Sequence, residues 1–132
     1  MPSFLYIEDD SLSRQVLTII LTMQMGYEDV IVFEDSTDYA ARIAALPFVP
    51  DVVFLDIHMR PHTGTEILVH LRMMPQYANA RVVALTASVM NEEVEMLRTA
   101  GFDGVIGKPI NHATFPDLLT RILKGEKIWN PA

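Results

Sequence analysis

The sequence contains no cysteine, which excludes disulfide bridges and thiolate chemistry. This absence fits a reducing compartment, and we expect a cytoplasmic protein. The first ten residues, MPSFLYIEDD, lack a basic segment and turn acidic, unlike a signal peptide. The longest apolar runs fall well short of the roughly 18 residues that a membrane-spanning helix needs, so we expect no membrane insertion.

Basic residues are also scarce, with 10 Lys and Arg against 17 Asp and Glu and a net charge of −7. Nucleic-acid surfaces need clustered Lys and Arg, and we therefore expect no nucleic-acid partner. No Walker or GxGxxG loop is present either, which argues against a nucleotide or dinucleotide site. At 132 residues, half of them apolar, the chain is long enough for one domain with a sizeable core.

What the sequence does contain is a series of short apolar runs that alternate with helix-length segments. The runs are too apolar to face water on either side, as a parallel sheet covered on both faces requires. They occupy residues 4–7, 30–33, 52–55, 81–85 and 104–107. Five strands alternating with five helices predict an α/β fold, a doubly wound, flavodoxin-like (βα)5 sandwich. Its five-stranded parallel sheet should have the order 2-1-3-4-5.

The segments between the runs carry apolar residues at helical spacing and residues typical of helix ends. The predicted apolar stripe of the first helix consists of Leu12, Val16, Ile20 and Met23. Ser36 is the predicted N-cap of the second helix, and Gly101 is the predicted C-cap of the fourth. The segment Thr114-Phe-Pro-Asp117 resembles a capping box at the start of the fifth helix.

Polar residues follow four of the predicted strands, at the edge where doubly wound sheets place their ligands. These residues are Glu8, Asp9, Asp10, Asp56, Thr86 and Lys108. Carboxylates gathered at one edge repel each other, and a hard cation such as Mg²⁺ relieves that repulsion. An oxyanion beside the cation would need a fixed positive charge and a hydroxyl donor, which Lys108 and Thr86 supply. The pattern predicts phosphate chemistry with Mg²⁺, although Asp10 is equally explained as a turn residue or helix N-cap.

The motifs IEDDSLSR, FLDIHMRPHTG, ALTAS and GFDGVIGKPI occur in an order and spacing that resemble the receiver domain of two-component response regulators. The resemblance covers nearly the whole chain and implies a role for each site residue. Asp56 would be the phosphoacceptor, Thr86 the switch hydroxyl and Lys108 the cation that pairs with the phosphoryl group. The Mg²⁺ ligands would be Asp9, Asp56 and the backbone carbonyl of His58, with Glu8 acting through water. The side chains of His58 and Ser88 would flank the path of the water that hydrolyses the acyl phosphate.

The resemblance also implies partners and a domain organisation. We expect a sensor histidine kinase or a phosphotransfer protein as the phosphoryl donor, a downstream protein target, and a monomer or weak dimer. The receiver domain is predicted to span residues 1–125, followed by a short tail at 126–132 and no output domain. The chain would be a signalling phosphoacceptor that catalyses only its own phosphorylation and autodephosphorylation, not an enzyme acting on other substrates.

Two departures from the family pattern bear on this interpretation. Arg60 takes the place of a common proline, which moves to Pro61, and Thr63 replaces a common aspartate. Val105 stands where the family often has Tyr or Phe, so the aromatic half of the usual switch is missing. The second departure favours a rival hypothesis, a phosphorylation-independent adaptor with a receiver fold.

Other interpretations receive less support from the residues. Zinc could be considered because His58 and His62 are four residues apart, but they lie in a predicted loop and no cysteine joins them. A flavodoxin-like cofactor binder would need a phosphate loop after the first strand, where this chain has the acidic EDDSLSR. Trp129, in the tail, either packs back on the domain or belongs to an interface.

Overall fold

The chain folds as five strands that alternate with five α-helices, and the computed structural model describes residues 1–129. The strands are β1 (Phe4–Ile7), β2 (Val30–Phe33), β3 (Val52–Asp56), β4 (Arg81–Thr86) and β5 (Gly104–Gly107). The α-helices are α1 (Ser11–Ile19), α2 (Tyr39–Ala44), α3 (Gly64–Arg72), α4 (Asn91–Ala100) and α5 (Phe115–Leu123). The π-helical η1 (Ile20–Gln24) continues α1, and the separate 3₁₀ turn η2 (Pro75–Tyr77) follows α3.

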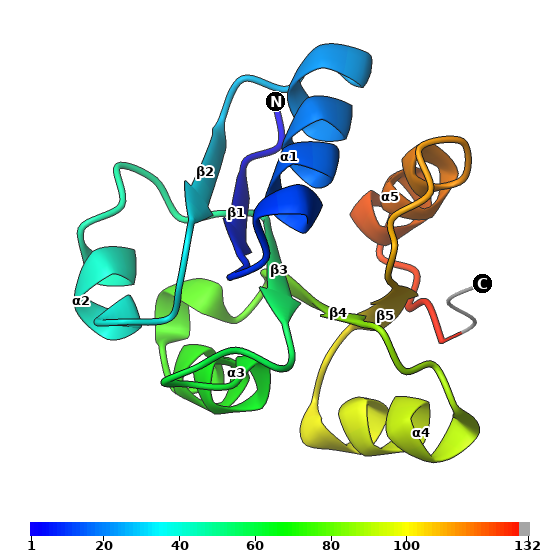
Figure 1. Cartoon of the computed structure of the whole chain (residues 1–132). Coiled ribbons are helices and arrows are strands. Elements are labelled where there is room, and N and C mark those ends of the chain that lie inside the picture. The colour runs from blue at the N-terminus through cyan, green and yellow to red at the C-terminus, as the bar shows by residue number, and fades with distance from the viewer. Residues whose placement is uncertain (130–132) are drawn as a thin grey trace.

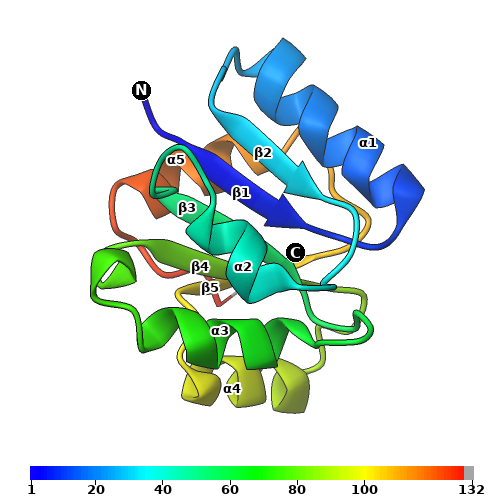
Figure 2. The same ribbon diagram turned by 90° about the vertical axis from the view of Figure 1, so that its left-hand side faces the viewer.

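All neighbouring strands pair in parallel, in the order β2-β1-β3-β4-β5. Helices α1 and α5 cover one face of the sheet, and α2, α3 and α4 cover the other (Figure 1). Figure 2 shows α2 in front of the strands, with α3 and α4 below the sheet and α1 above it. The predicted fold class and strand order are therefore confirmed. The register pairs Ile7 with Leu55, and the residue after Leu55 pairs with Leu85, so the carboxyl ends of the central strands meet at one edge.

Two apolar layers hold the sheet between its helices. Every residue of β1 and β3 is buried. Along β1 the side chains alternate: Phe4 and Tyr6 join the layer under α1 and α5, while Leu5 and Ile7 join the layer under α2, α3 and α4. Full burial of each large apolar side chain contributes roughly 1.5–3 kcal/mol. Because this alternation has a period of two, the side chain of Glu8, just beyond the strand, lies on the same side as Tyr6.

The predicted apolar stripe of the first helix is wrong at both ends. Leu12 is 68% exposed and Met23 is 80% exposed. The buried residues of this stretch are Leu17, Ile20 and Leu21, so the predicted burial of Ile20 is confirmed. At the C-terminal end the physical reason is local: the helix widens into the π-helical turn of η1, which rotates Met23 away from the position that a regular α-helix would give it.

Two predicted helix caps are also wrong. Helix α2 begins three residues after Ser36, behind a left-handed Asp38 (φ 50°), and the buried Ser36 hydroxyl accepts the backbone N–H of His62 (2.9 Å). The Thr114 side chain caps nothing, because its backbone already has helical dihedrals that point the hydroxyl away from the first turn. The carboxamide of Asn111 accepts the N–H of Ala113 just before this helix (2.8 Å). The predicted C-cap at the end of α4 is confirmed, with its glycine at φ 112°.

The segment after α5 returns to the sheet. Ile128 is buried and forms a parallel bridge with Gly104, and its carbonyl accepts the N–H of Val105 (2.8 Å). Trp129 packs against the layer under α2, α3 and α4, and the Arg98 guanidinium lies 5.6 Å from the centre of its ring. Of the two alternatives for Trp129, packing back on the domain is therefore the one the structure shows. The last three residues of the predicted tail, 130–132, lie outside the described part of the chain.

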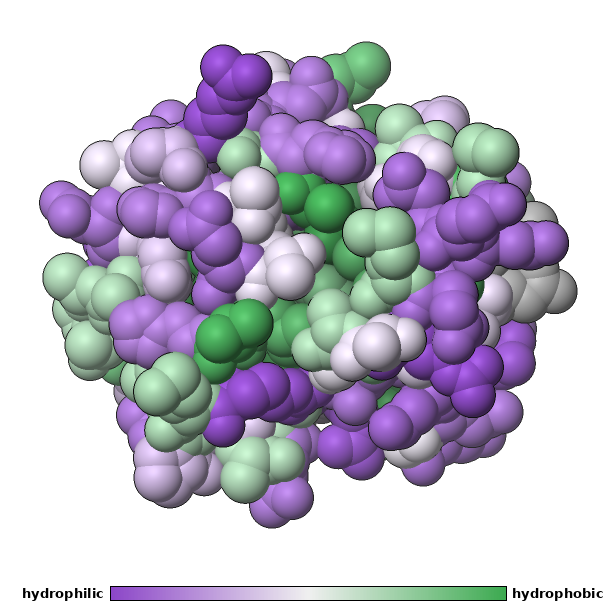
Figure 3. Space-filling view, turned by 90° about the horizontal axis from the view of Figure 1, so that it is seen from below, coloured by the Kyte–Doolittle hydropathy of each residue, from purple (hydrophilic) through white to green (hydrophobic). Residues whose placement is uncertain are grey.

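The surface that Figure 3 shows is mostly hydrophilic, with apolar side chains gathered near its centre. Among residues 1–129, no helix combines the length and the apolar character that crossing a bilayer would require.

Candidate functional site

The predicted acidic residues come together at the carboxyl ends of β1 and β3. One carboxylate oxygen from each of Glu8, Asp9 and Asp56 lies within 4.8 Å of the others. Glu8 and Asp56 are buried, while Asp9 is exposed. The sheet register explains this proximity, because β1 and β3 are paired neighbours that end at the same level. The third acidic residue of the first motif, Asp10, is the N-cap of α1, and its carboxylate accepts the N–H of Ser13 (2.8 Å).

Lys108 reaches this cluster from the end of β5. Its Nζ atom donates to Glu8 Oε1 (3.2 Å) and Oε2 (3.3 Å) and lies 3.4 Å from Asp56 Oδ1. Its backbone N–H donates to the carbonyl of Thr86 (2.8 Å), which ties the residue to the end of β4. A single ammonium group thus bridges two buried carboxylates.

The charges in the cluster perturb one another. Burial and a hydrogen bond shared with Asp56 raise the pKa of Glu8 to about 7. Burial would also raise the pKa of Asp56, but the hydrogen bond from Glu8 and the charge of Lys108 outweigh it and hold that pKa below its usual range. Burial and the neighbouring Asp56 raise the pKa of Asp9. Crowded carboxylates therefore retain a proton, which a bound cation would displace.

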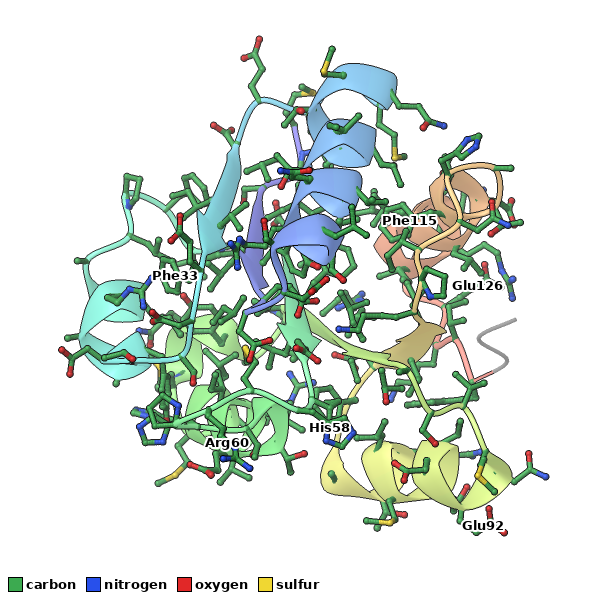
Figure 4. All side chains as sticks on the ribbon, viewed as in Figure 1. Phe33, His58, Arg60, Glu92, Phe115 and Glu126 are labelled. Carbon is green, nitrogen blue, oxygen red and sulfur yellow. The ribbon has the colours of Figure 1, made fainter. Side chains whose placement is uncertain are left out.

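The loop after β3 is shaped around Asp56. The backbone N–H of His58 donates to Asp56 Oδ1 (3.3 Å), while the imidazole of His58 is exposed. Figure 4 shows His58 and Arg60 on this loop. A Cβ atom on Gly64 would lie 2.5 Å from the carbonyl oxygen of Asp56, so the first turn of α3 packs directly on the backbone of the acidic residue. Glycine is required at this position by close approach rather than by its dihedral angles.

His62 anchors the same loop. Besides the bond from its N–H to Ser36, its imidazole pairs with Glu66 (2.9 Å) and packs edge-on against Tyr39 (5.1 Å between ring centres). Within residues 1–129, the three carboxylates of the acidic cluster are the only group of three or more His, Cys, Asp or Glu side chains whose ligand atoms lie within 4.8 Å of one another. The geometry therefore gives the two loop histidines no zinc site.

Comparison with known proteins agrees with this geometry. The family model described as the response regulator receiver domain matches residues 4–121. The chain belongs to the response regulator receiver domain family. The resemblance noted from the motifs is thus confirmed, and receiver domains act in phosphorylation-based signalling rather than in enzymatic turnover of other substrates.

Curated and structural relatives fit the same assignment. Stress response regulator protein 1 of Meyerozyma guilliermondii is 32% identical over 109 residues, which cover 83% of this chain and 50% of the relative. The nitrate/nitrite response regulator protein homolog of Haemophilus influenzae is 30% identical and covers 94% of this chain and 58% of the relative. The receiver domain thus spans about half the length of these two curated relatives. The chemotaxis response regulator CheY4 of Vibrio cholerae superposes with a TM-score of 0.80 at 29% identity, covering 92% of this chain and 98% of CheY4.

In this receiver domain the predicted switch residues lie on the β4 and β5 side of the cluster. Thr86 is fully buried at the end of β4, and its hydroxyl accepts the N–H of Ser88 (3.2 Å). Val105 is fully buried in the layer under α2, α3 and α4. The position where relatives often carry an aromatic ring is therefore filled and closed to solvent here.

One polar residue of the site was missed by sequence reasoning. The hydroxyl of Tyr6, inside β1, donates to Glu8 Oε1 (2.9 Å), and the pair is buried. Burial, followed by the charge of Glu8, raises the pKa of Tyr6 far above its usual range, so the phenol remains a neutral donor. The signal was available: residues i and i+2 of a strand share a face, and a tyrosine inside an apolar strand needs a partner for its hydroxyl.

Proposed function

We propose that this receiver domain accepts a phosphoryl group from a histidine kinase or a phosphotransfer protein on Asp56. The observation that carries the proposal is the buried Asp56 carboxylate, with Lys108 Nζ 3.4 Å away and two further carboxylates beside it. The low pKa of Asp56 keeps this carboxylate ionised, as a nucleophile must be. Such a cluster has little structural value in itself, since buried charges cost stability unless they are paired.

These positions support the following reaction. A lone pair of the Asp56 carboxylate forms the new O–P bond, while the P–N bond of the donor phosphohistidine breaks and its electron pair returns to the imidazole. Lys108 offsets the charge on the phosphoryl oxygens, and the hydroxyl of Thr86 supplies a hydrogen bond to one of them. The N–H of His58, already bonded to Asp56 Oδ1, orients the carboxylate throughout.

The donor set fits Mg²⁺, which prefers oxygen ligands and retains several waters. We propose Asp9, Asp56 and the carbonyl of His58 as ligands, with Glu8 acting through water because its two oxygens already accept bonds from Tyr6 and Lys108. Bound Mg²⁺ would supply the positive charge that lets three carboxylates and a phosphoryl group share one small site.

The wider role is also part of the proposal. We propose that the domain works in the cytoplasm, as a monomer or weak dimer, and that phosphorylation changes the surface it presents to a downstream protein. The fully buried Val105 supports the rival hypothesis of a phosphorylation-independent adaptor, because the side chain has little freedom to move with Thr86. The two hypotheses differ in whether Asp56 becomes phosphorylated at all.

Acetyl phosphate with Mg²⁺ tests the proposal directly. We expect wild-type protein to gain one phosphoryl group by intact mass, and Asp56→Asn to gain none, because an amide is a poor nucleophile. Asp10→Asn is the matched control: it removes the same charge from the neighbouring N-cap, where Asn caps as well as Asp, and should label like the wild type. Labelling of Asp56→Asn at another residue would refute the assignment. An unlabelled wild type, also with a panel of autophosphorylated kinases, would favour the adaptor.

A further inference from the structure

Tyr6 occupies an unusual place for a hydroxyl. It lies in the middle of β1, fully buried, with its ring edge-on to Phe54 (6.4 Å between ring centres) in the apolar layer under α1 and α5. The phenol oxygen lies at the edge of that layer nearest the acidic cluster, 2.9 Å from Glu8 Oε1. Packing on all sides holds the ring in place, so the hydroxyl is a fixed donor beneath the acidic cluster.

Glu8 needs such a donor because its carboxylate is fully buried. It accepts bonds from the Tyr6 hydroxyl, the backbone N–H of Asp10 (3.3 Å) and Lys108 Nζ. Two of these donors are fixed by packing or by the backbone. The third, Lys108, is a flexible side chain that also lies 3.4 Å from Asp56.

Lys108 is therefore divided between two carboxylates, and phosphorylation changes what it must pair with. Once Asp56 carries the phosphoryl group as an acyl phosphate, its negative charge moves out to the phosphoryl oxygens, beyond the position of the carboxylate. Pairing with them draws the ammonium group away from Glu8. Moving Lys108 away costs free energy if it leaves the buried Glu8 carboxylate short of hydrogen-bond donors. The cost is smaller if another hydrogen-bond donor remains on Glu8 Oε1.

We infer that Tyr6 is a positioning residue for the phosphoryl transfer, whose hydroxyl holds Glu8 in place and so frees Lys108 to move to the phosphoryl group. This inference rests on the proposed function. The hydroxyl of Tyr6 donates to Glu8, so Tyr6 acts on the site through Glu8. Its requirements are met by the geometry: a ring held by packing and a direct bond to the same oxygen, Oε1, that Lys108 also contacts.

The test uses the intact chain and compares Tyr6→Phe with Tyr77→Phe. Both substitutions delete the hydroxyl of a buried tyrosine, but Tyr77 lies in η2, in the opposite apolar layer. We expect the initial rate of labelling by acetyl phosphate at fixed Mg²⁺ to fall roughly tenfold in Tyr6→Phe, the loss expected for one hydrogen bond to a charged group. The Tyr77→Phe rate should match the wild type.

A double-mutant cycle then separates positioning from packing. In a Glu8→Gln background the ionic hold on Lys108 is gone, so adding Tyr6→Phe should slow labelling less than about twofold. If Tyr6 merely supports the fold, Tyr6→Phe would slow labelling by the same factor in the wild-type and Glu8→Gln backgrounds. Equal labelling of wild type and Tyr6→Phe, or an undiminished loss in the Glu8→Gln background, would overturn the inference.

A measurement on unmutated protein guards against misfolding of the variant. With ¹³Cζ-labelled tyrosine, adding Mg²⁺ and beryllofluoride, a phosphoryl mimic, should shift the Tyr6 resonance as Lys108 leaves Glu8, while Tyr77 stays still. A Tyr6 resonance that does not move while the site binds the mimic would contradict the inference. A wild type that neither binds the mimic nor becomes labelled would refute the proposed function instead.

Discussion

The pH dependence of stability provides a sharp test of the acidic cluster. The pKa of Glu8 is raised from 4.5 to about 7 in the folded protein, chiefly by burial and by the shared proton with Asp56. A raised pKa means that the folded state binds the proton more tightly than the unfolded chain does. The stability it contributes is fully present below about pH 4.5 and is lost as the pH rises through about 7.

The size of the effect follows from the two pKa values. Between about pH 5 and pH 7, linkage predicts a loss of about 2 kcal/mol in the free energy of unfolding. Asp9, whose pKa is also raised, acts in the same direction. Asp56, whose pKa is lowered, acts in the opposite direction, but only in more acidic solution, because its contribution is lost as the pH falls through its folded value.

Urea denaturation at a series of pH values measures this loss. With an m-value of roughly 2 kcal/mol per molar, the midpoint should fall by about 1 M from pH 5 to pH 7. Glu8→Gln should flatten the curve, because the amide does not titrate. Glu92→Gln, on α4 far from the cluster, is the control for net charge (Figure 4). Mg²⁺ should stabilise the wild type more at pH 7 than at pH 5. A wild-type curve as flat as that of Glu8→Gln, or one that rises with pH, would refute the reasoning.

Three further predictions follow from other contacts. Gly64→Ala should destabilise the protein by about 1–3 kcal/mol and abolish most labelling, because its Cβ would lie 2.5 Å from the carbonyl oxygen of Asp56. Gly26→Ala is the control: its Cβ meets open space, so it should lower stability through its φ of 78° but leave labelling intact. Ile128→Ala should cost about 2–4 kcal/mol in a urea melt, since this tail residue is buried; a loss under 0.5 kcal/mol would show that the tail is dispensable. His58→Ala should change the decay rate of phosphorylated Asp56 several-fold, followed by mass, yet leave Mg²⁺ affinity unchanged because the proposed ligand is the backbone carbonyl; unchanged decay would contradict it.

The sequence by itself determined the fold class, the strand order and the set of residues at the strand ends. It could do so because parallel strands buried on both faces must be apolar throughout, and such runs are easy to recognise at residues 4–7 and 52–55. The carboxyl ends of parallel strands meet at one edge, so Glu8 and Asp56 could be predicted to be neighbours before any coordinates were known.

Only the tertiary structure decided how those residues share their charges and hydrogen bonds. The raised pKa of Glu8 and the lowered pKa of Asp56 depend on burial and on distances of about 3 Å to Lys108, which no periodicity encodes. The role of Ser36 was likewise hidden, because a hydroxyl that could cap a helix locally serves a loop 26 residues away. Tyr6 read as one more apolar strand residue until the packing of β1 set its hydroxyl against Glu8, since a strand pattern specifies which face a side chain occupies but not which partner it meets there.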